Sequence, residues 1–342
     1  SSTKKADCIN YLLRTLAETT MEEPQNQNKS SLKSSPFPPP PGLAEKATNE
    51  VQEGAGGLKI CVLQPDYSTS DVDYKNYDPA RDLGHLMPYA TFDHVLLNKL
   101  STYKQLKELK KKNYDVFVNL CEGYLEWNIP SIDVIYFMEL LNLPFTGPSS
   151  LLYDPPKDLM KYVAYTAGIK TPAFALIESL DCIVKECSHL QYPLFVKPDK
   201  AGDSLGIDDN SLVHNKGELV NKCAAIIEEY GPLLVEEYIE GREFTVMLVA
   251  NADDEKTCTV FKPIEYIFPK GFEFKTYALK TSELHPEANI PCNDPILEEQ
   301  LKEAALQIFQ GFGAVGYARL DFRVNAKKEI FFLEINFTCS VF

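Results

Sequence analysis

The stretch ARLDFRVNAKKEIFFLEINFT, residues 318–338, places charged side chains at alternating positions within two apolar runs. We predict a hairpin that turns at VNAKK, with Arg319 and Asp321 on one face of its first strand and Glu334 and Asn336 on one face of its second. Burying two carboxylates costs several kcal/mol unless another group compensates. A hard divalent cation with oxygen ligands, such as Mg²⁺ shared with substrate phosphates, would compensate. The alternative is a solvent-facing stripe in which Arg319 pairs with Asp321.

A second stretch, FVKPDKAGDSLGID at residues 195–208, ends an apolar strand in Lys197 and continues as a loop of small residues. Successive N–H groups in such a loop can point at one anion, and Lys197 adds a fixed positive charge. The loop is not a Walker P-loop, because no Gly-Lys-Ser/Thr sequence follows its glycines. The alternative is an ordinary hairpin turn. Together, the two stretches favour a site for a phosphate-bearing ligand with Mg²⁺.

Between them lies EEYIEGREFTVMLV, residues 236–249, in which charges lead directly into an apolar strand. A nucleotide bound here would need polar groups for the edge of its base and an acid for its ribose hydroxyls. The segment EEYI offers backbone groups to the base, and Glu243 offers an acceptor to the ribose. The charges that begin this strand would therefore surround an adenosine.

These motifs together resemble the ATP-grasp superfamily, and within it the D-alanine–D-alanine ligases and their carboxylate–amine ligase relatives. The resemblance covers about residues 58 to 342. It rests on five motifs in the family's order, which are YDVFVNLCEG, LPFTG with a following lysine, VKPDKAGDSLGI, EEYIEGREFTV, and GYARLDFR with FLEIN. It implies a mixed α/β and α+β architecture with an N-terminal parallel α/β domain, a small central domain and a C-terminal, mostly antiparallel sheet. ATP would bind between the last two.

The resemblance also implies a role for each matching residue. ATP would be held by Lys157 and Lys197 at the phosphates, by the closing loop Gly202, Asp203, Ser204, Leu205 and Gly206, by the adenine hinge Glu236, Glu237, Tyr238 and Ile239, and by Glu243 at the ribose. Arg319 would stabilise the transferring phosphoryl group, and Lys280 would be a further lysine on the phosphate side. The metal ligands would be Asp321, Glu334 and Asn336, which would hold Mg²⁺, with Mn²⁺ as a substitute.

The implied reaction is an ADP-forming ligation in two steps. A substrate carboxylate attacks the γ-phosphorus to give an acyl phosphate, and an amine then displaces phosphate to form an amide. The closed loop would keep water away from the acyl phosphate. The alternative is a nucleotide-binding module without turnover, or an inactive fragment of a longer ligase. The end of the sequence six residues after Asn336 favours that alternative.

The sequence departs from the D-alanine ligase pattern at several positions. Glu122-Gly123 stands where the family has His-Gly, and Ala201 and Asp203 replace Glu and Ser in the loop. The family's acid after the first strand has no equivalent in LQPDYSTSD, and Ser340 stands at a family glycine. A carboxylate at Glu122 pairs with an ammonium group rather than with a carboxylate. We therefore predict an amino acid or small peptide substrate whose amino group faces Glu122, and a main product other than D-alanyl-D-alanine. The alternative is that Glu122 is a solvated loop acid.

The elements that would position these residues suggest four segments. Residues 1–57 are predicted as a disordered tail and linker, residues 58–150 as an α/β substrate domain, residues 151–235 as a central subdomain and residues 236–342 as a C-terminal, truncated subdomain. The stretch INYLLRTLAE in the tail is predicted as a short amphipathic helix, either isolated or the end of a preceding domain. Strand-like runs are LKICVLQPD, YDVFVNLCEG, LPFTG, AFALI, YPLFVKPD, PLLVEEYI, REFTVMLVA, TVFKPIEYI, ARLDFRV and EIFFLEIN. Several of them would make a largely antiparallel sheet.

Four helices are predicted between these strands. One opens near Pro130 or Ser131, and one in PPKDLMKYVAYTAGI ends at Gly168. The remaining two span about residues 216–229 and 295–311, the last with Asp294 as its N-cap. The apolar face predicted for the second helix consists of Leu159, Met160, Val163, Ala164 and Ala167.

Composition limits the function further. The chain has 342 residues and a formal net charge of −15, which argues against nucleic acid as a partner. Nine scattered cysteines without a CxxC pair indicate free thiols rather than a disulfide framework or a zinc site. No apolar run reaches the roughly 18 residues of a membrane span. We expect a cytoplasmic protein that binds small molecules, and a homodimer is left open.

Overall fold

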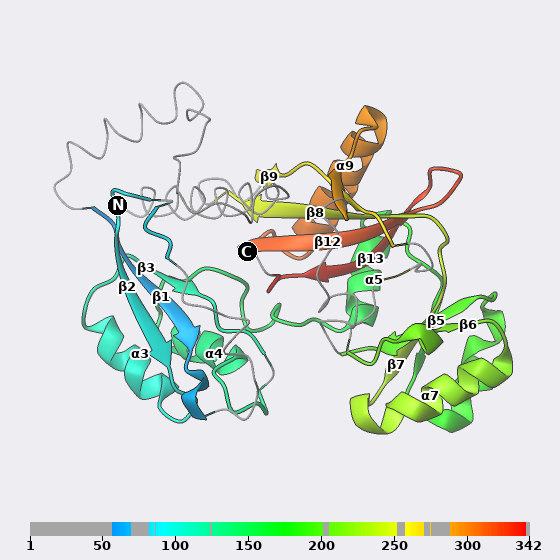
Figure 1. The fold of residues 1–342 in the computed structure, drawn as a ribbon, viewed down its shortest axis with the longest axis horizontal. Coiled ribbons are helices and arrows are strands. Elements are labelled where there is room, and N and C mark those ends of the chain that lie inside the picture. The colour runs from blue at the N-terminus through cyan, green and yellow to red at the C-terminus, as the bar shows by residue number, and fades with distance from the viewer. Residues whose placement is uncertain are drawn as a thin grey trace. The chain divides into compact units, whose positions relative to one another are not determined.

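The computed structural model describes residues 57–69, 82–85, 87–123, 125–200, 205–251, 257–269, 274 and 288–339 (Figure 1). The chain divides into two compact units, residues 1–146 with residue 342, and residues 147–341. The predicted helix in INYLLRTLAE, the loop residues Gly202, Asp203 and Ser204, and Lys280 lie outside the described residues. The finer predicted borders at residues 150 and 235 stay predictions.

The first unit is built on a three-stranded parallel sheet in the order β2–β1–β3, with β1 at Lys59–Pro65, β2 at Thr91–Leu97 and β3 at Val116–Asn119. A short 3₁₀ helix, η1 (Tyr67–Thr69), follows β1. Helices α3 (Thr102–Lys110) and α4 (Ile132–Leu140) pack together, with the rings of Tyr103 and Phe137 5.3 Å apart. The strand predicted in LPFTG is only a single parallel bridge from Phe145 to Phe117.

The second unit contains a four-stranded antiparallel sheet in the order β4–β7–β5–β6. Its strands are β4 (Phe174–Ile177), β5 (Leu194–Pro198), β6 (Leu212–Val213) and β7 (Leu233–Glu237). Helix α7 (Lys216–Tyr230) shares a buried core with these strands. Short helical segments η3 (Leu180–Cys182), α6 (Ile183–Glu186), η4 (Cys187–His189) and η5 (Asp209–Ser211) complete this part.

A six-stranded antiparallel sheet forms the rest of the second unit, in the order β11–β10–β8–β12–β13 with β9 also pairing β8. Its strands are β8 (Arg242–Ala250), β9 (Cys258–Val260), β10 (Ile264–Tyr266), β11 (Asn289–Pro291), β12 (Tyr317–Val324) and β13 (Ile330–Asn336). The run TVFKPIEYI is two strands rather than one. Pro263 lies between them, where a missing N–H would interrupt a strand ladder.

Helices α5 (Lys157–Thr166) and α9 (Pro295–Gly311) pack on one face of the larger sheet. The N-cap predicted at Asp294 is confirmed, because its side chain accepts hydrogen bonds from the Ile296 and Leu297 N–H groups at 3.1 and 3.2 Å. None of the described helices is long and apolar enough to cross a membrane. The described cysteines are all free thiols.

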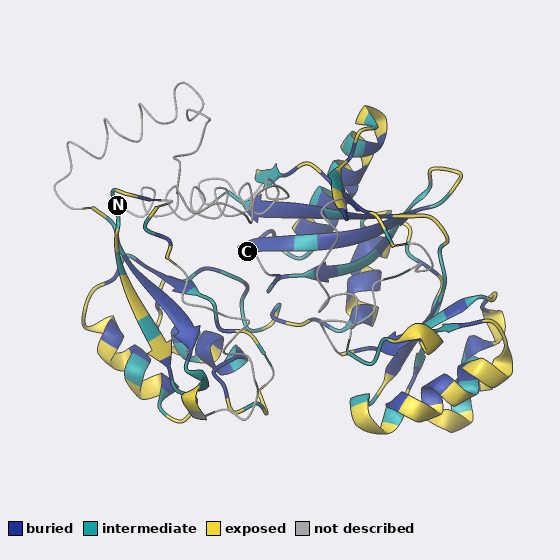
Figure 2. Ribbon diagram, in the orientation of Figure 1, coloured by how far each residue is buried: buried dark blue, intermediate teal, exposed yellow. Residues whose placement is uncertain are grey.

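The two faces of the larger sheet have different characters because side chains alternate along each strand. Phe244, Val246, Leu320 and Phe322 face the helices and are fully buried in the main core. Figure 2 shows these central strands as mostly buried. The intervening side chains of β8 and β12 therefore line the opposite face, which faces away from α5 and α9. This polar face carries the residues predicted to do chemistry.

One prediction about helix α5 is wrong. Leu159 was placed on the apolar face but is 41% exposed, whereas Met160, Val163 and Ala164 are buried as predicted. The buried side of the helix includes Lys157 and Lys161. A helix that buries two lysines must bring them to compensating groups, since an isolated buried ammonium is very costly.

Strand β13 contains an irregularity that decides which of its side chains face the site. The β12–β13 register shifts between Asp321 and Phe322, so Asp321 pairs with Glu334 while Phe322 pairs with Phe332. Leu333 is the extra residue of a β-bulge. In a regular strand Phe332 and Glu334 would share a face, but here Phe332 is fully buried in the helix-side core. The bulge therefore lets Glu334 face the polar side.

Candidate functional site

Three buried lysines and one buried glutamate gather where α5 meets the smaller sheet. Lys157 and Lys161 lie one helical turn apart on α5, Lys197 is near the end of β5, and Glu236 is on the adjacent strand β7. Lys161 Nζ lies 2.6 Å from Glu236 Oε2, and Lys197 Nζ lies 2.5 Å from Glu236 Oε1. The side chains of Lys161 and Glu236 are 0% and 5% exposed. We call these four residues the lysine cluster.

The pKa values in the lysine cluster follow from one carboxylate serving two ammonium groups. Burial lowers the pKa of Lys161 to about 8, against the opposing attraction of Glu236. Burial would also lower the pKa of Lys197, but Glu236 and Glu334 together raise it above its ordinary value. The pKa of Glu236 is lowered because Lys161 and Lys197 outweigh its burial. The Lys197–Glu236 pair therefore stays ionised, and Lys161 loses its proton more easily than Lys197.

Lys157 is the third lysine of this cluster. Its Nζ donates to the main-chain oxygen of Asp199 at 3.2 Å, and burial lowers its pKa while Glu334 opposes the change. Glu334 also acts on Lys161 and Lys197. The polar face of the larger sheet and the lysine cluster are therefore electrostatically coupled. Asp154 and Asp199 also oppose the lowering of the Lys157 pKa, so the three lysines lie among several carboxylates. Three buried ammonium groups in one place are a candidate site for an anion.

The loop after β5 is anchored at its far end. Gly206 has φ +73°, and a Cβ there would lie 2.8 Å from Pro198 Cγ, so the position requires glycine. Lys222 of α7 donates to the Gly206 carbonyl at 3.0 Å and to Asp208 Oδ1 at 2.9 Å. Lys222 therefore fixes the point at which the predicted loop rejoins the domain, with Leu205 beside it.

The predicted adenine hinge is partly committed to the fold. The N–H of Glu237 donates to the Ala173 carbonyl at 2.9 Å, and the N–H of Tyr238 donates to the Pro193 carbonyl at 3.0 Å. The carboxylate of Glu237 accepts from the Gln191 N–H at 2.9 Å. The N–H groups of Glu237 and Tyr238 are therefore not available to a base, and a donor to the base would come from Ile239.

A second charged group lies where the hinge crosses β12. The guanidinium of Arg323 donates from Nε and Nη2 to Glu243 Oε2 at 3.1 and 3.0 Å. Its Nη1 donates to the Tyr238 hydroxyl at 2.8 Å and to the Ile239 carbonyl at 3.3 Å. We call Arg323, Glu243, Tyr238 and Ile239 the arginine cluster. Gly241, at φ +150°, allows this approach, since a Cβ there would lie 2.1 Å from the Val324 carbonyl oxygen.

The predicted phosphoryl and metal residues form two neighbouring rows across the polar face. Strand pairing puts Thr245, Asp321 and Glu334 in one row, and Met247, Arg319 and Asn336 in the next. Arg319 Nε lies 3.5 Å from Asp321 Oδ1, so the ion pair of the alternative interpretation is present. That pair is partly buried rather than a solvated stripe, since Asp321 has only 10% of its side chain exposed.

These rows contain buried polar atoms that no hydrogen bond satisfies. They are Thr245 Oγ1, Asp321 Oδ1 and Asn336 Nδ2. Such atoms are rare in folded proteins and usually mark a position that a ligand, ion or water completes. Among the described residues, no group of three or more His, Cys, Asp or Glu side chains gathers as a metal site. The predicted set has two carboxylates and one carboxamide, which suits Mg²⁺ sharing its shell with phosphate oxygens.

Sequence reasoning missed two residues of this region, Lys161 and Arg323. Both have a simple signal. Lys161 follows Lys157 by four positions on the same helix, which puts both on one face. Arg323 follows Asp321 by two positions on the same strand, which puts both on the polar face.

Glu122 belongs to the first unit, in the loop that follows β3 at the carboxyl end of the parallel sheet. The loop is ordered by the Asn119 side chain, whose Oδ1 accepts from the Cys121 N–H at 3.1 Å. Gly123, at φ +128°, packs against the ring of Trp127, where a Cβ would come within 2.9 Å. Glu122 itself is exposed. Its predicted contact with substrate stays a prediction.

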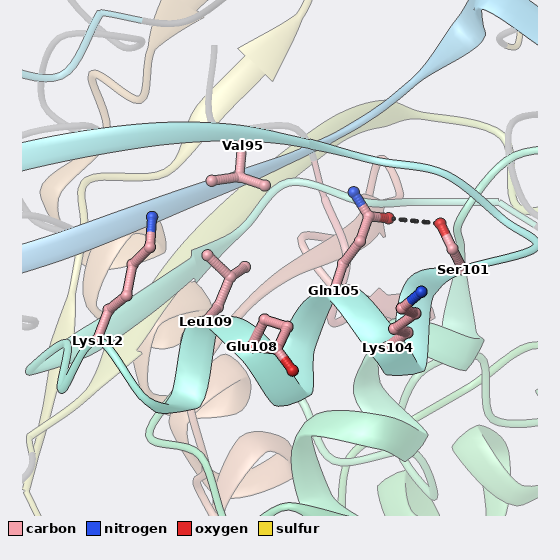
Figure 3. Close-up of a pocket in the computed structure, with 7 residues that line it drawn as sticks. All are labelled: Val95, Ser101, Lys104, Gln105, Glu108, Leu109 and Lys112. Atoms are coloured by element: carbon pink, nitrogen blue, oxygen red, sulfur yellow. Dashed lines mark hydrogen bonds between the residues drawn. The ribbon is translucent and has the colours of Figure 1, made fainter.

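The first unit also has a surface cavity of about 480 Å³ between β2 and α3 (Figure 3). It is lined by Val95, Ser101, Lys104, Gln105, Glu108, Leu109 and Lys112. Ser101 Oγ donates to Gln105 Oε1 at 3.2 Å across one side of it. None of the residues predicted from the sequence lines this cavity.

The antiparallel sheets, the lysine cluster and the two rows of polar residues on β12 and β13 together define an ATP-grasp protein. A solved structure of D-alanine–D-alanine ligase from Bacillus anthracis complexed with ATP has this fold, with a TM-score of 0.58 and 20% identity over 82% of this chain and 86% of that one. The family model described as the D-ala D-ala ligase C-terminus matches residues 163–339, more than half of the chain. The chain belongs to the D-alanine–D-alanine ligase family.

Two curated relatives show how similar the sequence is to known members of the family. A D-alanine–D-alanine ligase B from Clostridium tetani is 34% identical over 210 residues, which cover 58% of this chain and 56% of the relative. A D-alanine–D-alanine ligase from Aquifex aeolicus is 29% identical over 259 residues, or 75% and 80% of the two chains. The chain thus spans little more than half the length of the first of these relatives.

Proposed function

We propose that the chain is an ATP-dependent carboxylate–amine ligase that forms an amide or peptide bond and releases ADP and phosphate. The observation that carries the proposal is the lysine cluster, in which three buried lysines gather around Glu236 beside the buried polar atoms of the larger sheet that accept or donate no hydrogen bond. Burying that much positive charge is costly unless an anion compensates part of it. The triphosphate of ATP is such an anion, and the family relationship supports it.

In this proposal each end of the site has a distinct task. Lys157 and Lys197 contact the phosphates, and Lys161 keeps Glu236 oriented toward Lys197. The hinge at Glu236, Glu237, Tyr238 and Ile239 faces the base, while Glu243 faces the ribose. The loop from Gly202 to Gly206 covers the phosphates, and Lys280 is a further lysine beside them.

Asp321, Glu334 and Asn336 would hold Mg²⁺ with the help of phosphate oxygens. Asp321 Oδ1, which accepts no hydrogen bond and lies 3.5 Å from Arg319 Nε, and the adjacent Glu334 carboxylate fit a hard cation that prefers oxygen ligands. When bound, the cation would supply positive charge to the phosphate oxygens. The unsatisfied Asn336 Nδ2 is a donor, and it suits a phosphate oxygen beside the same cation.

The chemistry proceeds in two balanced steps. A carboxylate oxygen of the first substrate bonds to the γ-phosphorus of ATP, and the bond from that phosphorus to the bridging oxygen breaks to release ADP. The amine nitrogen of the second substrate then bonds to the acyl carbon, phosphate leaves with the electrons of the carbon–oxygen bond, and the amine proton passes to solvent. Arg319 and the lysines stabilise negative charge on the transferring group.

Glu122 supports an amino acid or small peptide as substrate, since a carboxylate binds an ammonium group. The relatives are named for D-alanine, but the Glu122-Gly123 pair favours a different main product in this chain. We place the reaction in the cytoplasm.

The test is ATP-dependent phosphate release with a panel of D- and L-amino acids. Wild type should turn over with at least one amino acid, and Glu334→Gln and Asn336→Ala should abolish turnover while thermal melts show that the fold stays intact, because they alter ligands rather than core volume. Glu122→Gln should raise the KM for the preferred substrate. ATP binding without any release of phosphate would instead support the non-catalytic nucleotide-binding module. Efficient D-alanine dimerisation unaffected by Glu122→Gln would contradict the substrate proposal.

A further inference from the structure

Arg323 is buried at the hinge, with 4% of its side chain exposed. It makes contact with three parts of the arginine cluster through four hydrogen bonds, two to Glu243 and one each to Tyr238 and Ile239. Its guanidinium carbon also lies 5.0 Å from the centre of the Tyr238 ring and 5.3 Å from that of Phe268. A planar cation between two aromatic rings and a carboxylate is held in one orientation.

The pairing of Arg323 with Glu243 is built into the larger sheet. The two residues are direct cross-strand partners in the β8–β12 ladder, so their side chains leave the same face side by side. Both guanidinium contacts go to one oxygen, Oε2. An ionised carboxylate accepts about four hydrogen bonds, so it can serve the guanidinium and a ribose hydroxyl together.

We propose that Arg323 is a positioning residue that fixes the Glu243 carboxylate, together with the Tyr238–Ile239 hinge, for recognition of the ribose of a nucleoside triphosphate. This inference rests on the proposed function, because it assumes that ATP binds at this hinge. Arg323 does not touch the reacting phosphates. It determines how strongly the site distinguishes a ribonucleotide from its 2′-deoxy counterpart, because only a fixed carboxylate gains a well-directed hydrogen bond from the 2′-hydroxyl.

The orientation of Glu243 is the physical reason for this selectivity. A buried carboxylate without its guanidinium partner would take up a proton, rotate or recruit water, since an unpaired buried charge is strongly disfavoured. Each of these changes removes the directed acceptor. A hydrogen bond to a charged acceptor is worth roughly tenfold or more in affinity. The 2′-hydroxyl of ATP should gain that factor in wild type and lose it when Arg323 is removed.

The experiment measures the dissociation constants of ATP and 2′-deoxyATP by calorimetry for wild type and four variants of the same chain. Wild type should bind ATP roughly tenfold more tightly than 2′-deoxyATP. Arg323→Met, which keeps an unbranched apolar side chain, should bring the ratio close to one, as should Glu243→Gln. The double variant Arg323→Met/Glu243→Gln should lower the ratio no further, because both act through one carboxylate. Arg323→Lys keeps the positive charge but not the forked guanidinium, and its ATP to 2′-deoxyATP ratio should fall between those of wild type and Arg323→Met.

The chain offers a matched control at the neighbouring position. Arg242 begins the same strand as Glu243 and makes two hydrogen bonds to Glu265, at 2.7 and 2.5 Å, on the opposite face. Arg242→Met removes an arginine–carboxylate pair from the same sheet, and it should leave the ATP to 2′-deoxyATP ratio at the wild-type value. Thermal melts identify any variant that fails to fold, and Arg323→Lys then carries the test.

Three outcomes are separable. Equal weakening of ATP and 2′-deoxyATP by Arg323→Met would overturn the inference and make Arg323 a structural support of the hinge. A wild-type ratio near one, with ATP still bound, would overturn it as well while leaving the proposed function in place. Absence of ATP binding to the wild-type chain would overturn both proposals.

Discussion

The lysine cluster and the arginine cluster are two buried ionic groups of the same unit, but they balance charge differently. In the lysine cluster one carboxylate, Glu236, bridges Lys161 and Lys197, with Lys157 nearby. In the arginine cluster one carboxylate, Glu243, meets one guanidinium. The first gathers three ammonium groups around one bridging carboxylate, so it suits an anionic ligand. The second is balanced internally, so it suits a neutral sugar and base.

The kind of cation differs as well. Lysine is a compact ammonium whose pKa responds strongly to burial, whereas arginine stays protonated at every accessible pH and presents a rigid fork. Lys161 has a pKa lowered by burial to about 8. The charge at one end of the site therefore depends on pH near neutrality, and the charge at the other does not. Substitutions at the two ends should separate these properties.

The largest expected effect is on stability at the lysine cluster. Glu236→Gln removes the shared carboxylate and leaves two buried ammonium groups without it, which should cost about 3–5 kcal/mol of unfolding free energy. Lys161→Met is the matched variant, since it leaves Glu236 with Lys197 as a balanced pair, and its loss should be clearly smaller. Urea denaturation measures both. A Glu236→Gln protein as stable as wild type would show that Glu236 does not balance the lysines.

The next effect is on nucleotide affinity. Lys197→Ala should weaken ATP by about 1.5–3 kcal/mol, roughly tenfold to a hundredfold, because a charged phosphate contact is lost. Lys157→Ala should act in the same direction. Both should weaken ATP and 2′-deoxyATP equally, in contrast to Arg323→Met. Lys262→Ala, an exposed lysine near Glu298, is the control and should leave calorimetric affinities unchanged. Unchanged ATP affinity in Lys197→Ala would remove this lysine from the site.

The smallest effect is a dependence of stability on pH. The pKa of Lys161 is lowered by burial from 10.5 to about 8, so between these values the unfolded chain binds more protons than the folded one. Stability from this group therefore increases as pH rises from about 8 to about 10.5, by the linkage between proton binding and folding. The expected gain is on the order of 1–3 kcal/mol.

The measurement for this last effect is a difference between proteins. Burial raises the pKa of the thiols of Cys61 and Cys223 to about 12 and that of Cys187 to about 11, which lowers the stability of every variant above pH 9. Subtracting the unfolding free energy of Lys161→Met from that of wild type cancels this contribution. The difference should rise between pH 8 and 10.5, and the corresponding difference for Arg323→Met should stay flat. A flat difference for Lys161→Met would show that its proton is not shifted.

Strong local signals made much of the second unit predictable. The alternation in ARLDFRV and EIFFLEIN predicted the β12–β13 hairpin, with Arg319 and Asp321 on one face of its first strand and Glu334 and Asn336 on one face of its second. Asp294 and Pro295 predicted the start of α9. These elements are long, and each has one buried face, so the period of the sequence matches the structure except at the bulge of β13.

Elements whose pattern is weak were missed. Strand β2 has the sequence TFDHVLL and lies at the edge of the parallel sheet, where most of its side chains are exposed or half-buried. An edge strand of this kind lacks the buried alternation that identifies a strand. Helix α3, with the lysine-rich sequence TYKQLKELK, was missed as well. Leu159 was misplaced because the buried side of α5 carries Lys157 and Lys161, which face compensating charges. The leucine therefore lies on the exposed side.

The site residues that were missed depended on tertiary partners. Lys161 and Arg323 were not singled out in the sequence, and their burial is explained by Glu236 and Glu243, which lie on other elements. The sequence did suggest each glutamate as a nucleotide contact. It did not suggest that each already has a cation in contact with it. That pairing depends on the strand register between β7 and β5 and between β8 and β12.

The bulge at Leu333 has a consequence for changes in chain length. Phe332 and Ile335 face the helix-side core, and Glu334 and Asn336 face the polar side, so Leu333 is the residue that interrupts the alternation. Losing one residue elsewhere in β13 would turn the following side chains over, exchanging core for site. Losing Leu333 would instead restore regular alternation and keep every neighbour on its present side. A deletion of Leu333 alone would therefore leave the core and site side chains on their present faces of the sheet. It would remove the local twist that a bulge adds.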